Sequence, residues 1–299
     1  MKHADIIQTL DLEQKCALLS GGTVFDTRAL PGKGIPSITL SDGPNGVRKQ
    51  AGAADHLGLN PSVPATCFPT SATVANSWDP ALGEAVGEAM GEEAAAQEVS
   101  VLLGPGLNIK RSPLCGRNFE YFSEDPYLAG KMAAGYVRGI QKNGIAACPK
   151  HFACNNQEFK RTEIDSVLSE RALREIYLRA FETAVKEGGA YSVMSTYGGL
   201  NGIWTASNFD LLTTILRDEW GFTGTVMTDW WAKGNDREGE EATRENVAAQ
   251  VRAQNDLNMV NADAASNSQH DNLDDALADG RLTRDALVRS AMNICRTVM

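Results

Sequence analysis

The sequence of 299 residues lacks the histidine and cysteine patterns that are typical of metal sites and disulfide frameworks. Its four histidines, none in an HxH or HExxH pattern, are His3, His56, His151 and His270. The sequence therefore lacks the usual signature of a catalytic metal site. The six cysteines are scattered and include no CxxC pair, which argues against a zinc knuckle and against a disulfide framework. We expect no metal, no cofactor and a location in the reducing cytoplasm.

Positive charge and long apolar runs are also scarce. Lys and Arg number 28 against 38 Asp and Glu, a net charge of −10, and no basic stripe appears, so we expect no nucleic-acid partner. No apolar run approaches the ~20 residues that cross a bilayer, so we expect no membrane association. Segment 1–22 mixes charged and apolar residues and lacks the core of a secretion signal. We expect one catalytic domain over 1–299, since α/β barrels of roughly 250 residues are single domains.

The sequence is rich in short apolar runs that alternate with amphipathic helical segments. Helix-start signals stand at Asp79-Pro80, Ser169 and Asn208, before helices expected over 81–97, 170–189 and 209–220. Strands are expected at 37–42, 99–106, 145–151, 191–197, 224–230 and 256–262, with a weaker one near 67–75. Such alternation implies right-handed crossovers and a parallel sheet.

The sheet has two possible closures, a barrel and an open doubly wound sheet. The segment GPGLNI after the second clear strand lacks the third glycine of a dinucleotide fingerprint. Polar residues instead follow four different strands: Asp42, the pair Lys150 and His151, Tyr197, and Asp229. Barrel enzymes collect their catalytic groups at this end of the strands. We therefore predict an α/β fold of the (β/α)8 TIM-barrel type, with irregular first strands.

Asp229 ends the apolar run GTVMT and is followed by two of the five tryptophans. A helix cap or a hydrogen-bonded buried acid explains Asp229 about as well as a functional role, and Trp230 and Trp231 more often belong to a core. Sugar rings, however, stack their C–H faces on indole and need charged partners for their hydroxyls. The combination favours a carbohydrate site.

Two further segments carry candidate ligands. Lys150 suits a Schiff-base nucleophile as well as a ligand, and a lone histidine such as His151 is more often structural. Loop 104–126 combines Gly and Pro with several charged residues, a composition typical of an ordered, ion-paired functional loop. We expect Arg117 and the acids to hold this loop together, and Arg111 to be the ligand.

Six segments together resemble the N-terminal barrel domain of the family 3 glycoside hydrolases, in their β-glucosidase branch. They are SDGPNGVR (41–48), GPGLNIKRSPLCGRNFEYFSEDP (104–126), KHFACNNQE (150–158), SERALREIYLRAFE (169–182), VMSTYGGLNG (193–202) and VMTDWW (226–231). The resemblance covers nearly the whole chain, and its motifs are long and in the family's order.

The resemblance implies a retaining β-glycosidase that acts on a β-linked oligosaccharide or an aryl or alkyl β-glucoside. Asp229 matches the nucleophile, with Thr228 where the family has serine. The positions that match the sugar subsite are Asp42, Arg111, Lys150, His151, Arg161, Tyr197 and Trp230. Retention needs an ionised nucleophile and a second, protonated carboxyl group roughly 5 Å away. We expect nearby Arg and Lys to lower the pKa of Asp229.

The acid/base group is missing from the motifs. Short single-barrel members carry a histidine after KHF, whereas this chain reads KHFACNNQE. The resemblance implies a glutamate from an α/β sandwich domain, on another chain or downstream, because the sequence stops about where that domain would begin. The alternatives are a sugar-binding barrel or inactive truncated domain, and a lyase that uses Lys150. Full activity without that domain would require a local acid among Glu120, Glu124, Glu158 and Glu163.

Overall fold

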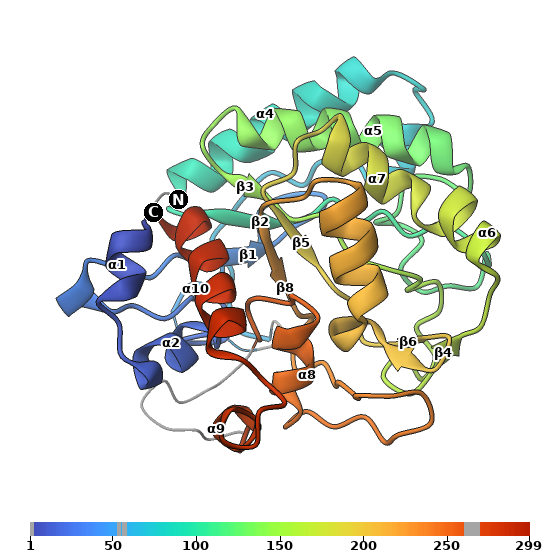
Figure 1. Ribbon diagram of the computed structural model, residues 1–299. Helices are drawn as coiled ribbons and strands as arrows, with labels where there is room; N and C mark the ends of the chain where they lie inside the picture. The colour runs from blue at the N-terminus through green and yellow to red at the C-terminus, as the bar shows by residue number, and fades with distance from the viewer. Residues whose placement is uncertain (1–2, 53–54, 56–58, 260–269) are drawn as a thin grey trace.

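The computed structural model describes residues 3–52, 55, 59–259 and 270–299, in which short strands alternate with helices (Figure 1). Strands β1 (Leu40–Asp42), β2 (Val101–Leu103) and β3 (Ala146–Ala147) form a parallel sheet in that order. Strand β5 (Ser192–Met194) pairs in parallel with β8 (Thr225–Met227). Strands β4 (Asp165–Ser166), β6 (Gly199–Leu200) and β7 (Ile203–Trp204) form a small separate sheet. The predicted α/β alternation is confirmed.

Hydrogen bonds connect the two parallel sheets. The backbone N of Met194 donates to the carbonyl of Pro149 at 3.0 Å, and Oγ of Ser192 donates to the carbonyl of Ala147 at 3.0 Å. On the far side of β8, Leu257 forms a parallel bridge with Met227. The strand predicted at 256–262 is thus represented by Leu257 beside β8, and its residues 260–262 lie outside the described part.

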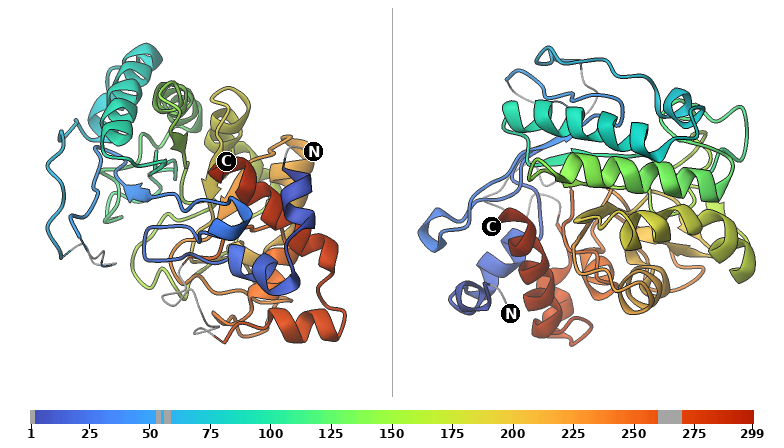
Figure 2. Two further views of the ribbon diagram at one scale, coloured as in Figure 1. Left: turned by 90° about the vertical axis from the view of Figure 1, so that its left-hand side faces the viewer. Right: turned by 90° about the horizontal axis from the view of Figure 1, so that it is seen from above.

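Helices flank the strands in all three views (Figures 1 and 2). The α-helices are α1 (Ala4–Gln8), α2 (Leu12–Leu18), α3 (Ser71–Ala75), α4 (Pro80–Ala96), α5 (Pro126–Gln141), α6 (Glu170–Ala172), α7 (Arg179–Lys186), α8 (Val247–Arg252), α9 (Leu273–Ala278) and α10 (Arg284–Val298). The described residues also form two 3-10 turns, η1 (Pro31–Lys33) and η3 (Thr205–Ser207), and two π-helical segments, η2 (Leu173–Tyr177) and η4 (Asp210–Glu219). None of the helices within the described residues has the length and apolar character that a membrane crossing requires.

The predicted helix starts are confirmed by their caps. The side chains of Asp79, Ser169 and Asn208 accept from backbone N–H groups two or three residues onward, at 2.9, 3.2 and 3.0 Å. The weak strand predicted near 67–75 is wrong, because residues 71–75 form α3. The hydroxyl of Thr70 accepts from the backbone N of Thr73 at 3.2 Å, and this cap outweighs the β-propensity of the segment.

Helices α4 and α5 lie side by side with their backbones in close approach (Figure 2). A Cβ atom at Gly139 would lie 2.1 Å from the carbonyl oxygen of Glu84, and one at Gly87 would lie 2.5 Å from that of Tyr136. Glycine is needed at these positions because no larger residue leaves room for the neighbouring backbone.

Strands β1, β2, β3, β5 and β8 are buried on both faces. Leu102, Val193 and Val226 belong to an apolar cluster with α4, α5 and α7, whereas Val101 and Met194 belong to a second cluster with α10. Side chains alternate between the faces of a strand, so continuous apolar runs are what this position requires. The one charged residue within these five strands is Asp42, the last residue of β1.

Candidate functional site

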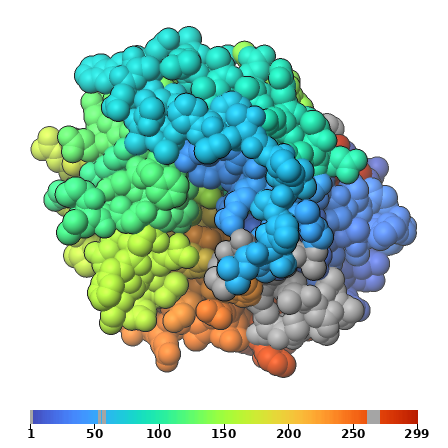
Figure 3. Space-filling view, turned by 180° about the vertical axis from the view of Figure 1, so that it is seen from behind, coloured from blue at the N-terminus to red at the C-terminus, as the bar shows by residue number. Residues whose placement is uncertain are grey.

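A cavity of about 270 Å³ lies at the carboxyl ends of the parallel strands. Its lining residues are Phe25, Asp42, Arg117, Lys150, His151, Arg161, Met194, Tyr197, Asp229 and Trp230. Asp42 is the last residue of β1, and Asp229 stands two residues beyond β8. Figure 3 shows this face, where segments coloured blue, green and orange surround a central hollow. Of the eight site residues predicted from sequence, the structure brings seven together in this cavity, all except Arg111.

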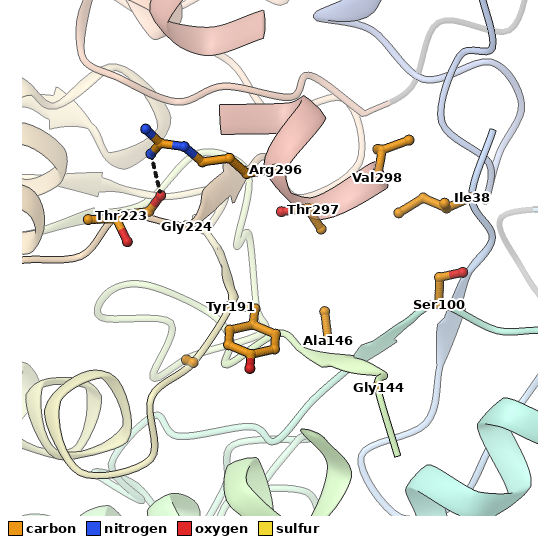
Figure 4. A pocket seen from close by; sticks show the side chains of 11 residues that line it. Ile38, Ser100, Gly144, Ala146, Tyr191, Thr223, Gly224, Arg296, Thr297 and Val298 are labelled. Atoms are coloured by element: carbon orange, nitrogen blue, oxygen red, sulfur yellow. Dashed lines mark hydrogen bonds between the residues drawn. The ribbon is translucent and has the colours of Figure 1, made fainter. Parts of the chain in front are cut away.

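A larger hollow, of about 450 Å³, lies at the opposite ends of the strands (Figure 4). It is lined by residues that precede strands, such as Ser100 and Tyr191, and by the end of α10. Arg296 of α10 donates to the carbonyl oxygen of Thr223 at 3.2 Å. The described lining contains no Asp, Glu, His or Lys. Of these two cavities, only the smaller one is lined by carboxylate, imidazole and lysine side chains.

Asp42 and Lys150 form an ion pair across the cavity wall, with 3.2 Å between Oδ1 and Nζ. The lysine side chain is 4% exposed, whereas 43% of the Asp42 side chain is open to solvent and to a ligand. Partial desolvation at the cavity wall raises the pKa of Asp42, but Lys150, Arg117 and Arg48 outweigh this effect, and the net pKa is lower than usual. Asp42 is thus an ionised acceptor, suited to bind hydroxyl groups.

Asp229 is buried at the base of the cavity. The backbone N of Trp230 donates to its Oδ1 at 2.8 Å, and Nε2 of His151 lies 3.8 Å from its Oδ2. Burial raises the pKa of Asp229 above its ordinary value, while Arg117, the Trp230 N–H, Lys150 and Arg161 limit that rise. The expectation that cations bring this pKa below its usual value is wrong, because desolvation is the larger effect.

Tyr197 and Arg161 complete the wall beside Asp229. Burial raises the pKa of Tyr197, and the charge of Asp229 raises it further, so the phenol keeps its proton. The guanidinium of Arg161 lies over the Tyr197 ring, 4.8 Å from its centroid, and donates to Glu158 at 3.0 Å. The two side chains hold each other in place through the cation–π contact.

The structure places Arg117, and not Arg111, on the cavity lining. Arg111 is exposed, because the chain turns after it: the side chain of Asn118 and the backbone N of Cys115 both donate to the carbonyl of Ser112. Arg117 does form the predicted ion pair with Glu120. It also faces the cavity, a second role that the loop's composition gave no reason to expect.

The indole of Trp230 forms an apolar wall with a residue that sequence patterns did not indicate. Its ring centroid lies 5.4 Å from that of Phe25, at an interplanar angle of 50°. The indole N–H donates to the carbonyl of Val24 at 2.7 Å, which fixes the ring. Phe25 and Met194, the other apolar lining residue, carry no sequence signal that would have assigned them to a site.

Carboxyl groups in the cavity are few. Among its described lining residues, only Asp42 and Asp229 carry one. Glu120 and Glu158 are engaged by Arg117 and Arg161. Across the described residues, no group of three or more His, Cys, Asp or Glu side chains is placed to hold a metal ion.

Comparison with known proteins gives consistent matches. The sequence profile of the glycosyl hydrolase family 3 N terminal domain matches residues 53–297. Thermostable beta-glucosidase B of Acetivibrio thermocellus is 45% identical over 293 residues, which are 98% of this chain and 37% of that protein. Exo-alpha-(1->6)-L-arabinopyranosidase of Bifidobacterium longum is 52% identical over 227 residues, 76% of this chain and 30% of that protein.

A solved structure agrees with these sequence matches. Beta-glucosidase 3B from Thermotoga neapolitana, in complex with alpha-D-glucose, superposes with a TM-score of 0.87 at 40% identity. The match covers 99% of this chain and 42% of that protein. The chain thus spans about a third of the length of the relatives that it matches.

Proposed function

The chain belongs to glycosyl hydrolase family 3, and from this premise we propose that its cavity binds the terminal glucosyl unit of a β-linked oligosaccharide or an aryl or alkyl β-glucoside. The observation that carries the proposal is the meeting of Asp42, Lys150 and Asp229, from the ends of three strands, in one cavity. We propose in addition that the parallel strands form a barrel of the (β/α)8 type, which collects catalytic groups at this end.

The sugar is held by charge-assisted hydrogen bonds in this proposal. Asp42 accepts from hydroxyl groups, while Lys150 and Arg117 donate to hydroxyl oxygens. The indole of Trp230 supplies a flat apolar surface for the C–H face of the ring. The cavity's charges and its aromatic wall support a carbohydrate over an apolar ligand.

Asp229 is the nucleophile in this reading. Its carboxylate attacks the anomeric carbon, the bond to the leaving oxygen breaks, and a covalent glycosyl-enzyme forms with inverted configuration. Water then attacks the same carbon and restores the original configuration. Arg117, Lys150 and Arg161 support the charged form that the attack requires, against the effect of burial.

The acid/base comes from outside the described part of the chain in this proposal. The greater length of the relatives supports a further domain, an α/β sandwich, that supplies it. Glu120 and Glu158 are held in ion pairs by Arg117 and Arg161 and are not among the described residues that line the cavity. A sugar-binding protein without turnover is the alternative, since the cavity serves binding as well as catalysis. The Lys150 lyase has less support, because its ammonium is engaged by Asp42 and a Schiff base needs the neutral amine.

The proposal is tested by comparing two substrates. General acid catalysis is worth about 10²- to 10⁴-fold, and the gain depends on how strongly the leaving group needs a proton. The 299-residue protein should therefore be nearly inert on cellobiose, whose leaving group is an alkoxide. It should still react with a dinitrophenyl β-glucoside. Full activity on cellobiose would contradict the missing-acid argument and direct attention to Glu120, Glu124, Glu158 and Glu163.

A further inference from the structure

A chain of buried hydrogen bonds runs behind the cavity wall and ends on His151. Tyr121, Asn155 and His151 are all at most 3% exposed. The hydroxyl of Tyr121 lies 3.1 Å from Nδ1 of His151, and Nδ2 of Asn155 lies 3.0 Å from that hydroxyl. The same Nδ2 lies 3.0 Å from Oε1 of Glu158, and Glu158 is bound by Arg161 at 3.0 Å.

The ion pair fixes the direction of every bond in this chain. The carboxylate of Glu158, held by Arg161, accepts hydrogen bonds and donates none, so the atom of Asn155 that faces it is the amide nitrogen. The two hydrogens of that nitrogen go to Glu158 and to the oxygen of Tyr121. The phenol therefore receives a hydrogen bond on this side and directs its own proton to the other side.

His151 Nδ1 is the acceptor within hydrogen-bond distance of that phenol proton in the described part of the chain. A neutral imidazole that accepts at Nδ1 carries its proton on Nε2. Burial, with Arg117, Lys150 and Arg161 nearby, brings the pKa of His151 well below its usual value, so the ring is neutral. Burial also raises the pKa of Tyr121, which keeps its proton.

The tautomer that carries its proton on Nδ1 would be disfavoured both at Nδ1, which faces Tyr121, and at Nε2, which faces Asp229. It would leave the phenol proton without a described acceptor, and it would turn the bare lone pair of Nε2 toward the carboxylate oxygen of Asp229 at 3.8 Å. The backbone of His151 is held separately, since its N–H and C=O both bond to the side chain of Asn108, at 2.8 and 2.9 Å. Tyr121 is therefore not needed to place the main chain.

We infer that Tyr121 is a positioning residue: directed by Asn155 and Glu158, it makes Nε2 of His151 a fixed hydrogen-bond donor into the cavity. At 3.8 Å this N–H is too far from Asp229 for a direct hydrogen bond, so it is available to a ligand oxygen. The value of this donor for a sugar hydroxyl rests on the proposed function. The tautomer itself does not depend on it.

The tautomer is measured without sugar, by long-range ¹H–¹⁵N NMR of the 299-residue protein with ¹⁵N-labelled histidine. Only four histidines give signals, and His151→Gln assigns the relevant one. The wild-type spectrum should show protonated Nε2 and bare Nδ1. Tyr121→Phe should populate the Nδ1–H tautomer. Asn155→Asp, whose carboxyl group shares one proton with Glu158 and turns an acceptor oxygen toward Tyr121, should reverse the tautomer.

A matched control is Tyr136→Phe, because Tyr136 is also fully buried and its hydroxyl lacks a hydrogen-bond partner among the described residues. It should leave the His151 signals unchanged. An Nδ1–H tautomer in the wild type, or an unchanged tautomer in Tyr121→Phe, would overturn the inference. If Tyr121→Phe fails to fold, Asn155→Asp tests the same inference, since it keeps the phenol and the size of the side chain at position 155.

Calorimetry with glucose then separates this inference from the proposed function. Tyr121→Phe should weaken binding about two- to ten-fold, the loss expected when one neutral hydrogen bond is no longer preorganised. If the tautomer changes but the glucose affinity does not, Nε2 of His151 does not donate a hydrogen bond to the bound sugar. No glucose binding by a wild type with the expected tautomer would contradict the proposed function and leave the assignment of Tyr121 standing.

Discussion

Nζ of Lys150 lies 3.2 Å from Oδ1 of Asp42, although 108 positions separate the two residues in the sequence. The pair joins the end of β1 to the segment after β3 and leaves the carboxylate partly open to the cavity. It neutralises a buried ammonium and presents an ionised acceptor to a ligand. The sugar-binding predictions begin from this pair.

Asp42→Ala should weaken the binding of glucose or a gluconolactone-type inhibitor. The mutation removes a charged acceptor and leaves Lys150 without its partner, and losing a hydrogen bond to a charged group costs roughly 1.5 to 3 kcal/mol. Isothermal titration calorimetry measures the difference. Affinity equal to that of the wild type would argue against Asp42 as a hydroxyl ligand.

Arg117 and Arg111 provide a matched pair within one loop. Arg117→Gln should reduce glucose affinity by about ten-fold or more, since it removes a donor that lines the cavity, whereas exposed Arg111→Gln should change it by less than about two-fold. Parallel titrations of the two variants check this. The reverse ranking would restore Arg111 as the ligand and require the loop to rearrange when sugar binds.

Asp229→Asn should stabilise the ligand-free protein at neutral pH. The folded-state pKa of Asp229 is raised, so the folded protein binds the proton more tightly than the unfolded chain and loses stability as pH rises through this range. Asn removes the free-energy cost of keeping a buried carboxylate charged in the folded protein. The gain in Tm should shrink as pH falls toward the ordinary Asp pKa of about 3.9. Exposed Asp218→Asn is the control. A loss of stability in Asp229→Asn at neutral pH would contradict a raised pKa of Asp229.

Gly139→Ala should destabilise the protein, although alanine favours an exposed helix by about 1 kcal/mol. Its Cβ would lie 2.1 Å from a backbone carbonyl of α4, and overpacking of this kind typically costs about 1 to 3 kcal/mol. Gly83→Ala, whose nearest neighbours are side-chain atoms at 3.2 and 3.3 Å, should cost less. Urea unfolding of both variants measures the two changes, and a more stable Gly139→Ala protein would refute the close approach.

Local signals in the sequence were sufficient to predict much of the fold. Caps at Asp79 and Ser169 act within three residues, so they can be recognised without knowledge of tertiary contacts. Asp229 stands out because the run before it, GTVMT, contains no charged residue. The weak strand predicted near 67–75 is wrong because the cap at Thr70 starts a helix there.

The remaining parts of the site depend on contacts between distant segments. Arg117 reaches the cavity only because of turns within loop 104–126, and its neighbour Glu120 made a purely local ion pair appear sufficient. Phe25 contacts Trp230 from the other end of the chain. The raised pKa of Asp229 follows from how deeply the fold buries it, a quantity that its neighbours in the sequence do not reveal.

The nucleophile is the central claim, and covalent labelling tests it most directly. A 2-fluoro dinitrophenyl β-glucoside has a leaving group that hardly needs a proton, and its fluorine slows hydrolysis of the glycosyl-enzyme. Peptide mass spectrometry should find the fluoroglucosyl group on Asp229, with Asp229→Asn unlabelled. A label on another residue would contradict the assignment, and no label in a protein that still binds glucose would favour a sugar-binding protein.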